Sequence, residues 1–329
     1  MGNQQSWGNR KVLVLSDGMS CGELVLGLYR VLMPDQLIVV VNTANDFDYF
    51  GLHISPGLDT SIYTLAGVNH HAAVTGRAGD TGIFMETMTL LGGETWYWMG
   101  DDDMLLTQMG RTHCRLNNQS LTTFTDAMRL SFGIRARVLP MSDDPVRTTV
   151  ETESGPWPLL YYVMQQRYNP LISRFYFDGI KTAQPNPVLL ETLADPELRA
   201  VIIGPANPFI GLEPILKLAG VTDALKACQA PVVAVSVDFG ASSMRVVTDN
   251  IIEPLNLVRE SDDVAHYYGS LLDGLVLRQQ DMNPNEELSV PNLITRSLSD
   301  EQRIGQHLAG EVLAFADELA THGVNSIGS

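Results

Sequence analysis

The sequence predicts an α/β fold built on a Rossmann-like, mostly parallel sheet with a smaller, partly helical added subdomain. Short apolar runs rich in β-branched residues alternate with helical patterns, at residues 11–15, 37–41, 201–203 and 232–235. Runs that are apolar on both faces are typical of strands buried inside a parallel sheet. A chain of 329 residues, 45% of them hydrophobic, suffices for one large α/β domain with an elaboration or for two smaller domains.

A β-α-β unit opens the chain. The first two apolar runs enclose residues 22–32, in which Leu24, Leu28 and Leu32 fall on one helical face. The crossover between parallel strands is expected to be right-handed, so the ends of both strands meet at the same edge of the sheet.

Residues 81–187 differ from the rest of the chain. Their alternation is weaker, Gly and Pro interrupt it, and helical patterns cover residues 82–91 and 121–132. We expect an inserted cap or substrate subdomain in this part of the chain. Residues 10–80 and 188–320 would then form the Rossmann-like nucleotide-binding core.

A long helix is predicted near the carboxyl end, at residues 300–319. Apolar residues repeat there every three to four positions, at Ile304, Leu308, Val312 and Phe315. Either Ser299 or Asp300 is a suitable cap for its first turn. The ends of the chain, 1–9 and 321–329, are rich in Gly, Asn, Gln and Ser, and we expect them to be flexible.

The composition limits the possible partners and compartment. Asp and Glu number 38 against 21 Lys and Arg, and the net charge of −17 disfavours nucleic acid and anionic membranes. Cys21, Cys114 and Cys228 are odd in number and scattered, so neither a disulfide scaffold nor a zinc knuckle is indicated. Because no run reaches the about 18 apolar residues of a membrane span and no signal peptide is visible, we expect a cytoplasmic protein.

Small and polar residues follow each apolar run. Ligands of open α/β sheets bind beyond the carboxyl ends of the strands, so these segments are the first place to look for a site. The segments are Ser16-Asp17-Gly18, Asn42-Thr43-Ala44-Asn45-Asp46, Gly204-Pro205-Ala206-Asn207-Pro208 and Ser236-Val237-Asp238.

Several motifs keep a recognisable order and spacing over about residues 10–280. They include Val39-Val40-Val41-Asn42-Thr43-Ala44-Asn45-Asp46, Gly51-Leu52-His53-Ile54-Ser55-Pro56-Gly57-Leu58-Asp59-Thr60, Leu139-Pro140-Met141-Ser142-Asp143-Asp144-Pro145-Val146 and Gly204-Pro205-Ala206-Asn207-Pro208-Phe209. Together they resemble the 2-phospho-L-lactate transferase family of coenzyme F-420 biosynthesis.

The resemblance implies a reaction, a cofactor and an assembly. In such enzymes the ribityl hydroxyl of a deazaflavin attacks a guanosine diphosphate-activated phosphoacid of phospholactyl, phosphoenolpyruvyl or phosphoglyceryl type, and GMP is released. Magnesium is required, and the proteins are commonly homodimers. We therefore expect a Mg²⁺-dependent transferase, with an activated phosphoacid and a deazaflavin as its small-molecule partners.

Two carboxylates are the expected metal ligands and catalytic groups. Asp46 and Asp59 lie on consecutive turns after the second apolar run, so both can approach one ion. Magnesium takes oxygen ligands and needs only one or two protein carboxylates, because it keeps several waters. The alternative is structural: Asp59 would cap the helix that begins at Thr60, and Asp46 would be a turn residue.

The remaining candidate residues divide into two groups. For nucleotide or phosphate binding we expect Gly18, Asn42, Thr43, Asn207 and Ser236. For substrate binding we expect Ser142, Asp143, Asp144 and Arg147, with the arginine countering a phosphate. Each group has a structural alternative, because Asn, Ser and Asp at strand ends often satisfy their own backbone, and a lone Arg is often a surface group.

Four aromatic side chains are candidates for stacking on a planar acceptor, with a place in the core as the favoured alternative. Trp96, Trp98, Tyr161 and Tyr162 would form a stacking wall, although aromatic residues are more often part of a core.

The first loop departs from the family pattern. A Gly-Gly-x-Gly-Gly loop followed by Lys is usual there, so that bare amides hold phosphate. This chain retains only Gly18, adds Asp17, and has Glu23 in place of the cation. Gly57 also stands where the family has Asp. Two added negative charges disfavour a diphosphate, so weaker nucleotide binding is expected.

Two function classes therefore remain open. The chain is either a transferase with a changed donor or acceptor, as Asp46 and Asp59 favour, or a non-catalytic relative that binds nucleotide or deazaflavin. An oxidoreductase that uses a dinucleotide is disfavoured, because no GxGxxG follows the first run.

Overall fold

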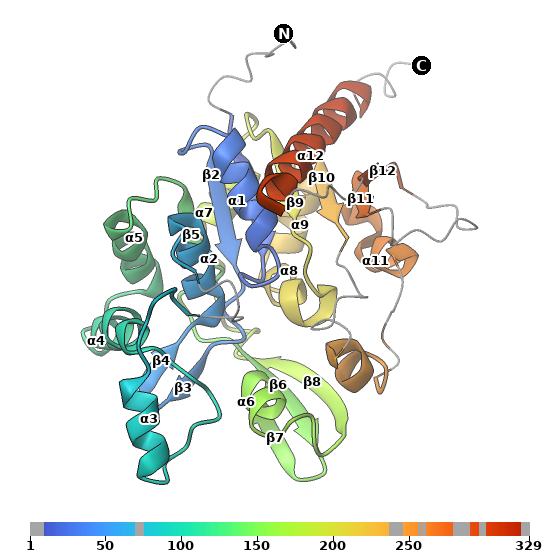
Figure 1. Cartoon of the computed structure of the whole chain (residues 1–329). Coiled ribbons are helices and arrows are strands. Elements are labelled where there is room, and N and C mark those ends of the chain that lie inside the picture. Colours follow the sequence, from blue (N-terminus) through green and yellow to red (C-terminus); the bar gives the residue numbers. More distant parts are fainter. Residues whose placement is uncertain are drawn as a thin grey trace.

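The computed structural model confirms the predicted α/β fold, and it describes residues 10–69, 76–236, 246–255, 257, 261–278, 290–295 and 301–323 (Figure 1). Seven parallel strands form the central sheet in the order β12-β11-β10-β9-β1-β2-β5. Their bounds are β1 Val12–Ser16, β2 Leu37–Val41, β5 Arg137–Pro140, β9 Ala200–Ile203, β10 Val232–Val235, β11 Gly274–Arg278 and β12 Asn292–Thr295.

The four apolar runs are the central strands of this sheet. All residues of β1, β2, β9 and β10 are buried, because helices cover the sheet on both faces. The predicted bounds of β2 and β10 are confirmed, β1 lies one residue later than predicted at both ends, and β9 begins one residue earlier. The chain order reverses between β1 and β9, which makes this pair the switch point of the sheet.

Two helices from opposite ends of the chain lie side by side on the sheet (Figure 1). They are α1, Gly22–Val31, and α12, Glu301–Gly323. Their backbones meet at two glycines, since a Cβ added to Gly27 would lie 1.9 Å from the Gly305 carbonyl oxygen. The predicted helices at 22–32 and 300–319 are thus confirmed, and α12 extends to Gly323, whereas Ser299 and Asp300 lie outside the described residues.

The remaining helices are short. The α-helices are α2 Pro56–Ala66, α3 Ile83–Leu90, α4 Gly110–Leu116, α5 Leu121–Ser131, α6 Leu159–Met164, α7 Pro187–Leu193, α8 Glu213–Leu216, α9 Val221–Ala227 and α11 Ser261–Tyr268. The π-helices are η1 Asp103–Met109, η2 Pro208–Leu212 and η3 Thr248–Ile252, and η4 Gly269–Leu271 is a 3-10 helix. The helical patterns at 82–91 and 121–132 correspond to α3 and α5.

Two small antiparallel sheets extend beyond the central sheet, at the lower side of Figure 1. One is the hairpin of β3, Phe47–Tyr49, with β4, Leu52–Ile54. The other has the order β7-β6-β8, with β6 at Arg147–Thr152, β7 at Gly155–Pro158 and β8 at Ile172–Asp178.

The expected boundary of the insertion does not follow the central sheet. Strand β5 belongs to the range 81–187, yet it pairs with β2 as the edge strand of the central sheet. The hairpin β3–β4 belongs to the range 10–80, yet it packs with Met85 and Tyr97 from the expected insertion. The division of the chain into core and insertion stays a prediction. Of the expected flexible ends, residues 321–323 are helical, while 1–9 and 324–329 lie outside the described residues.

Within the described ranges, no helix combines the length and the apolar character needed to cross a membrane.

Candidate active site

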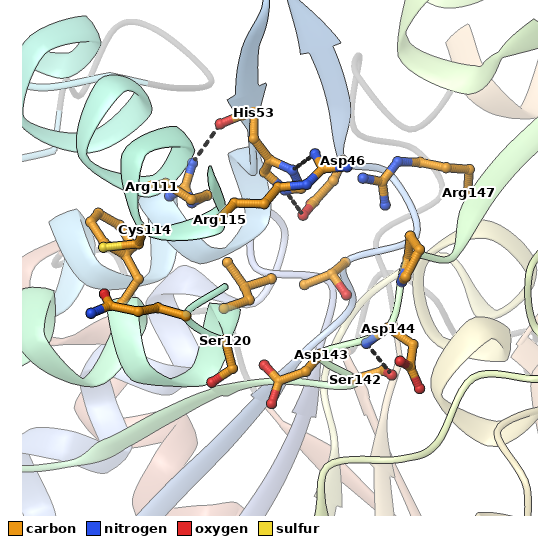
Figure 2. Close-up of a pocket in the computed structure, with 15 residues that line it drawn as sticks. Asp46, His53, Arg111, Cys114, Arg115, Ser120, Ser142, Asp143, Asp144 and Arg147 are labelled. Carbon is orange, nitrogen blue, oxygen red and sulfur yellow. Dashed lines mark hydrogen bonds and ion pairs between the residues drawn. The ribbon is translucent and has the colours of Figure 1, made fainter. Parts of the chain in front are cut away.

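An open pocket of about 110 Å³ lies at the carboxyl ends of β2 and β5 (Figure 2). Thr43 and Asp46 reach it from the segment after β2, and residues 142–145 reach it from the segment after β5. Helices α4 and α5 and the hairpin complete its wall. The full lining is Thr43, Asp46, His53, Arg111, Cys114, Arg115, Gln119, Ser120, Leu121, Phe124, Ser142, Asp143, Asp144, Pro145 and Arg147.

The pocket brings together about half of the residues predicted for the site. Thr43, Asp46, Ser142, Asp143, Asp144 and Arg147 line it. Gly18, Asn42, Asp59, Asn207 and Ser236 do not. The two groups separate by position, because the lining residues follow β2 and β5, whereas most of the others lie near the switch point between β1 and β9.

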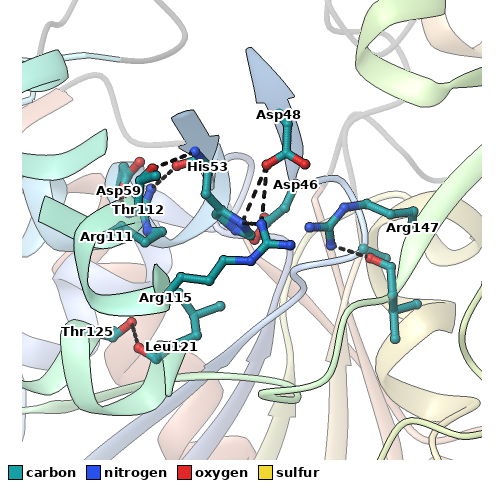
Figure 3. Close-up of polar contacts among 12 residues, drawn as sticks. Asp46, Asp48, His53, Asp59, Arg111, Thr112, Arg115, Leu121, Thr125 and Arg147 are labelled. Atoms are coloured by element: carbon teal, nitrogen blue, oxygen red, sulfur yellow. Dashed lines mark hydrogen bonds and ion pairs between the residues drawn. The ribbon is translucent and has the colours of Figure 1, made fainter. Parts of the chain in front are cut away.

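Asp46 is held by a buried histidine. The Oδ2 atom of Asp46 lies 3.0 Å from Nε2 of His53, and both side chains are buried. The Nη1 atom of Arg115 lies 2.9 Å from the other ring nitrogen, Nδ1 (Figure 3). Because a guanidinium only donates, Nδ1 accepts, and Nε2 carries the hydrogen that is donated to Asp46. Among the described residues, Oδ1 of Asp46 has no hydrogen-bond partner.

Three basic residues of the pocket were missed in the sequence. Arg111 and Arg115 lie four residues apart on α4, and this i, i+4 spacing was the available signal that both face one side. His53 lies on β4, in a hairpin too short to show a clear alternation. Arg147, which was predicted, starts β6 and donates from Nη1 to the Val146 carbonyl oxygen at 2.7 Å. Within the described residues, the Arg147 side chain has no ion-pair partner.

Asp59 lies behind the pocket, against Arg111. The helix cap that was the structural alternative for Asp59 is wrong, because α2 begins at Pro56 with Ser55 as N-cap, and Asp59 lies in its first turn. The carboxylate of Asp59 is ion-paired with Arg111 and accepts a hydrogen bond from Nε2 of Gln108 at 3.3 Å. Asp59 is only 4% exposed.

The charges around Arg111 do not balance. Burial raises the pKa of Asp59 to about 7; the charge of Arg111 opposes this shift, and the charges of Asp103 and Asp46 add to it. Burial lowers the pKa of Arg111, but the carboxylates of Asp59, Asp46 and Asp103 outweigh it, so the pKa of Arg111 is raised overall. Several buried carboxylates therefore share one guanidinium, and this region favours an additional positive charge.

The raised pKa of Asp59 gives a testable pH dependence of stability. The unfolded pKa is near 3.8 and the folded pKa is about 7, so between these values the folded state keeps a proton that the unfolded state releases. The contribution of Asp59 to stability is therefore largest below pH 3.8, falls as pH rises to about 7, and then stays constant. The effect is on the order of 1.4 kcal/mol per unit of pKa difference.

Urea unfolding of the wild type and of Asp59→Asn at several pH values between 4 and 7 measures this contribution. Asp59→Asn should lose much of the decline with pH, since Asn has no proton to release. Equal declines in the two proteins would show that Asp59 is ionised throughout the range.

The segment after β5 is fixed by its own side chains. The Oγ atom of Ser142 donates to the Gln184 carbonyl oxygen at 2.5 Å and accepts from the Asp144 amide at 3.0 Å. Asp144 accepts from the Gln184 amide at 2.8 Å, and Asp143 accepts from the Thr122 amide of α5 at 2.7 Å. These contacts are typical of a turn, which was the structural alternative to substrate binding for these residues. The segment also lines the pocket, so a substrate contact stays a prediction.

The asparagines near the switch point bond to backbone. Asn42 donates to the Gly211 carbonyl oxygen at 2.9 Å and accepts from the Ala44 amide at 2.8 Å. Asn207 caps η2, accepting from the amides of Phe209 and Ile210. Both side chains are buried, and these contacts favour their structural alternative. Phosphate binding by Gly18, Asn42, Asn207 and Ser236 stays a prediction.

The predicted aromatic wall is only partly assembled. Tyr161 stacks on Trp157 with ring centroids 5.2 Å apart and meets Trp96 at 5.0 Å. Tyr162 is fully buried and donates to the carbonyl oxygens of Tyr168 and Pro170, as expected for a core residue. Trp98 is 54% exposed. Trp96, Trp157 and Tyr161 thus form one half-buried cluster that joins the β3–β4 region to the β6–β8 sheet.

Comparison with protein families agrees with these motifs. A family model described as 2-phospho-L-lactate transferase CofD matches residues 12–289. The 2-phospho-L-lactate transferase of Methanothermobacter thermautotrophicus is 28% identical over 314 residues, covering 93% of this chain and 100% of the relative. The 2-phospho-L-lactate transferase of Methanosarcina mazei is 33% identical over 82% of this chain and 88% of the relative. The phosphoenolpyruvate transferase of Kitasatospora aureofaciens is 28% identical over 319 residues, covering 94% of this chain and 98% of the relative.

Solved structures share the fold. A member of the UPF0052 family from Bacillus halodurans superposes with a TM-score of 0.59 at 14% identity, covering 92% of this chain and 99% of that one. At this identity the similarity supports the architecture, and it says nothing about substrates.

Proposed function

The chain belongs to the 2-phospho-L-lactate transferase CofD family, and we propose that it transfers a phosphoacid group between a nucleotide and a deazaflavin. The donor is a guanosine diphosphate-activated phospholactyl, phosphoenolpyruvyl or phosphoglyceryl group. The acceptor is the ribityl hydroxyl of the deazaflavin, and the product belongs to coenzyme F-420 biosynthesis. Relatives that are named for phospholactate and for phosphoenolpyruvate are both similar to this chain, so the proposal keeps the donor at this class level.

One observation carries the proposal. The pocket places a buried carboxylate, Asp46, between two cationic side chains, Arg115 and Arg147 (Figure 2). Transfer to a hydroxyl needs a group that takes the hydroxyl proton and positive charges that stabilise the phosphoryl oxygens. The Oδ1 atom of Asp46 is the proton acceptor, while Arg115 and Arg147 bind the phosphoryl oxygens. The hydroxyl oxygen bonds to phosphorus as the bond from phosphorus to the GMP oxygen breaks.

The residues also fit the expected magnesium. Among the described residues no group of three or more His, Cys, Asp or Glu side chains is placed to hold a metal. Magnesium does not need such a group, because waters and substrate phosphates complete its coordination. Asp46 and Asp59 would hold the ion through its waters, so that Oδ1 of Asp46 stays available to the hydroxyl proton, and the surplus of buried carboxylates around Arg111 supports this assignment. The bound ion would neutralise negative charge on the diphosphate.

A non-catalytic role remains the second candidate. The observation that favours it is the loop after β1, where Asp17 replaces a glycine of the family pattern. In that case the chain would bind nucleotide or deazaflavin and form no product.

Binding of the acceptor can be tested without turnover. The half-buried cluster of Trp96, Trp157 and Tyr161 offers aromatic faces near the β6–β8 sheet, and stacking on such faces stabilises planar rings. Deazaflavin fluorescence should therefore become polarised on titration with the protein, and Tyr161→Ala should weaken binding about tenfold, while Tyr176→Ala on the exposed part of β8 should not. An unchanged affinity in Tyr161→Ala would place the acceptor ring elsewhere.

A further inference from the structure

The turn between β1 and α1 has the geometry of an anion site. It follows a strand at the switch point of the sheet, and it leads into a helix of ten residues. The first amides of a helix have no partner inside the helix, and they favour negative charge at this end. In open α/β sheets this turn is the general position for a phosphate.

The amides of this turn are already bonded to side chains of the turn itself. The Gly18 amide donates to Oγ of Ser16 at 2.9 Å. The amides of Met19 and Ser20 donate to Oδ1 of Asp17 at 3.1 and 2.9 Å. Three successive amides thus have partners, and the partner of two of them is a carboxylate, the same kind of anion that the site would bind.

The turn is also packed against its neighbours. Asp17 is only 7% exposed, and a Cβ added to Gly211 of η2 would lie 3.3 Å from the Asp17 Cβ. Gly18 has a φ of +84°, and a Cβ there would lie 2.2 Å from the carbonyl oxygen of Gly57, at the start of α2. The backbone of α2 and the π-helix η2 therefore contact the turn from two sides.

We propose that Asp17 is the built-in occupant of this anion site and excludes phosphate from it. The phosphates of a ligand are then bound one strand away, in the pocket at β2 and β5, by Arg115 and Arg147. Asp17 is thus a specificity-determining residue that moves phosphate recognition from the switch point to the arginine pocket. Binding of the donor nucleotide in the arginine pocket rests on the proposed transfer reaction. The exclusion of phosphate from the turn by Asp17 does not depend on that reaction.

Calorimetry with inorganic pyrophosphate on the full chain tests the proposal without turnover. Asp17→Ala removes the carboxylate, so the freed amides should bind pyrophosphate, and the affinity should rise at least about tenfold. Asp35→Asn is the matched control, since it removes the same charge from an exposed side chain before β2, at the end of that strand away from the pocket, and it should change the affinity less than about twofold. Asp17→Asn keeps an oxygen on the amides, so it should resemble the wild type.

A second substitution separates the two anion sites. In the wild type, Arg147→Gln should abolish most pyrophosphate binding, because the arginine pocket is the site in use. In Asp17→Ala, the gained binding should persist when Arg147→Gln is added. No gain in Asp17→Ala, or an equal gain in Asp35→Asn or Asp17→Asn, would overturn the proposal.

The wild type provides a readout that does not depend on any variant folding. Hydrogen exchange followed by mass spectrometry should show that pyrophosphate protects peptides containing Arg115 and Arg147 and leaves the exchange of residues 18–20 unchanged. Protection of residues 18–20 in the wild type would show that phosphate enters the turn, and it would contradict the proposal. Either result is independent of whether the protein forms the transfer product.

Discussion

Replacing Asp46 by Asn is expected to lower kcat of the proposed transfer by about 10²- to 10⁴-fold, the usual contribution of a positioned proton acceptor. Asn has nearly the shape of Asp and still accepts a hydrogen bond from His53, so the pocket should keep its form. It has no basic oxygen to take the hydroxyl proton. The loss should appear in kcat more than in the affinity for the deazaflavin.

The matched control for this substitution is Asp35→Asn. Asp35 is an exposed carboxylate before β2, at the opposite end of the same strand, so its removal changes the net charge equally and leaves the pocket intact. Its activity should stay within about twofold of the wild type. A rate for Asp46→Asn close to that of Asp35→Asn would exclude Asp46 as the proton acceptor.

Replacing Arg147 by Gln is expected to give the second largest loss, about 10²- to 10³-fold in kcat/KM. Among the described residues the Arg147 side chain has no ion-pair partner, and its guanidinium lines the pocket opposite Arg115 (Figure 2). A charge without a fixed partner is available to a phosphoryl group. Gln keeps a donor but removes the charge, so the loss should be greatest in the transition state.

Arg174→Gln provides the comparison for Arg147→Gln. Arg174 lies on β8, which pairs with β6, and it is an exposed arginine ion-paired with Glu151. An exposed pair of this kind contributes at most about 1 kcal/mol to stability, so little change in activity is expected. Similar losses in the two variants would point to a general effect of charge, and the role given to Arg147 would then be wrong.

The central strands could be predicted because burial on both faces leaves a continuous apolar run. Strand β5 did not stand out in the same way, since only Val138, Leu139 and Pro140 of its four residues are buried and it begins with an exposed Arg137. It was therefore assigned to the insertion. An edge strand carries a weaker apolar signal than a central one, and its partner β2 is about a hundred residues away in sequence.

The candidate site was predictable where it follows a strand and not where it depends on distant packing. Asp46 was found because it follows an apolar run that forms a central strand, whereas Ser142, Asp143 and Asp144 were found through a motif that resembles the family. Arg111 and Arg115 reach the same pocket from α4, which follows a π-helix and carries no clear apolar stripe. Their contacts to Asp59 and His53 join segments more than 50 residues apart, and no local pattern specifies such contacts.

The contact between Gly18 and Gly57 shows the same limit. In the sequence, Gly18 is a remnant of a glycine-rich loop and Gly57 replaces an expected Asp. In the fold these two glycines meet, and their lack of side chains allows the turn after β1 to lie directly on α2. The retained Gly18 and the change to Gly57 thus belong to one packing arrangement, which became visible only in three dimensions.

The most direct test of the proposed function is product formation by the full chain. The protein is incubated with a deazaflavin, magnesium and guanosine diphosphate-activated phospholactate, phosphoenolpyruvate or phosphoglycerate, and the products are followed by mass spectrometry. The account predicts a phosphodiester-linked deazaflavin and GMP in equal amounts with at least one donor, and loss of both products in Asp46→Asn. Binding of donor and deazaflavin without any product would contradict the transferase assignment and select the non-catalytic role.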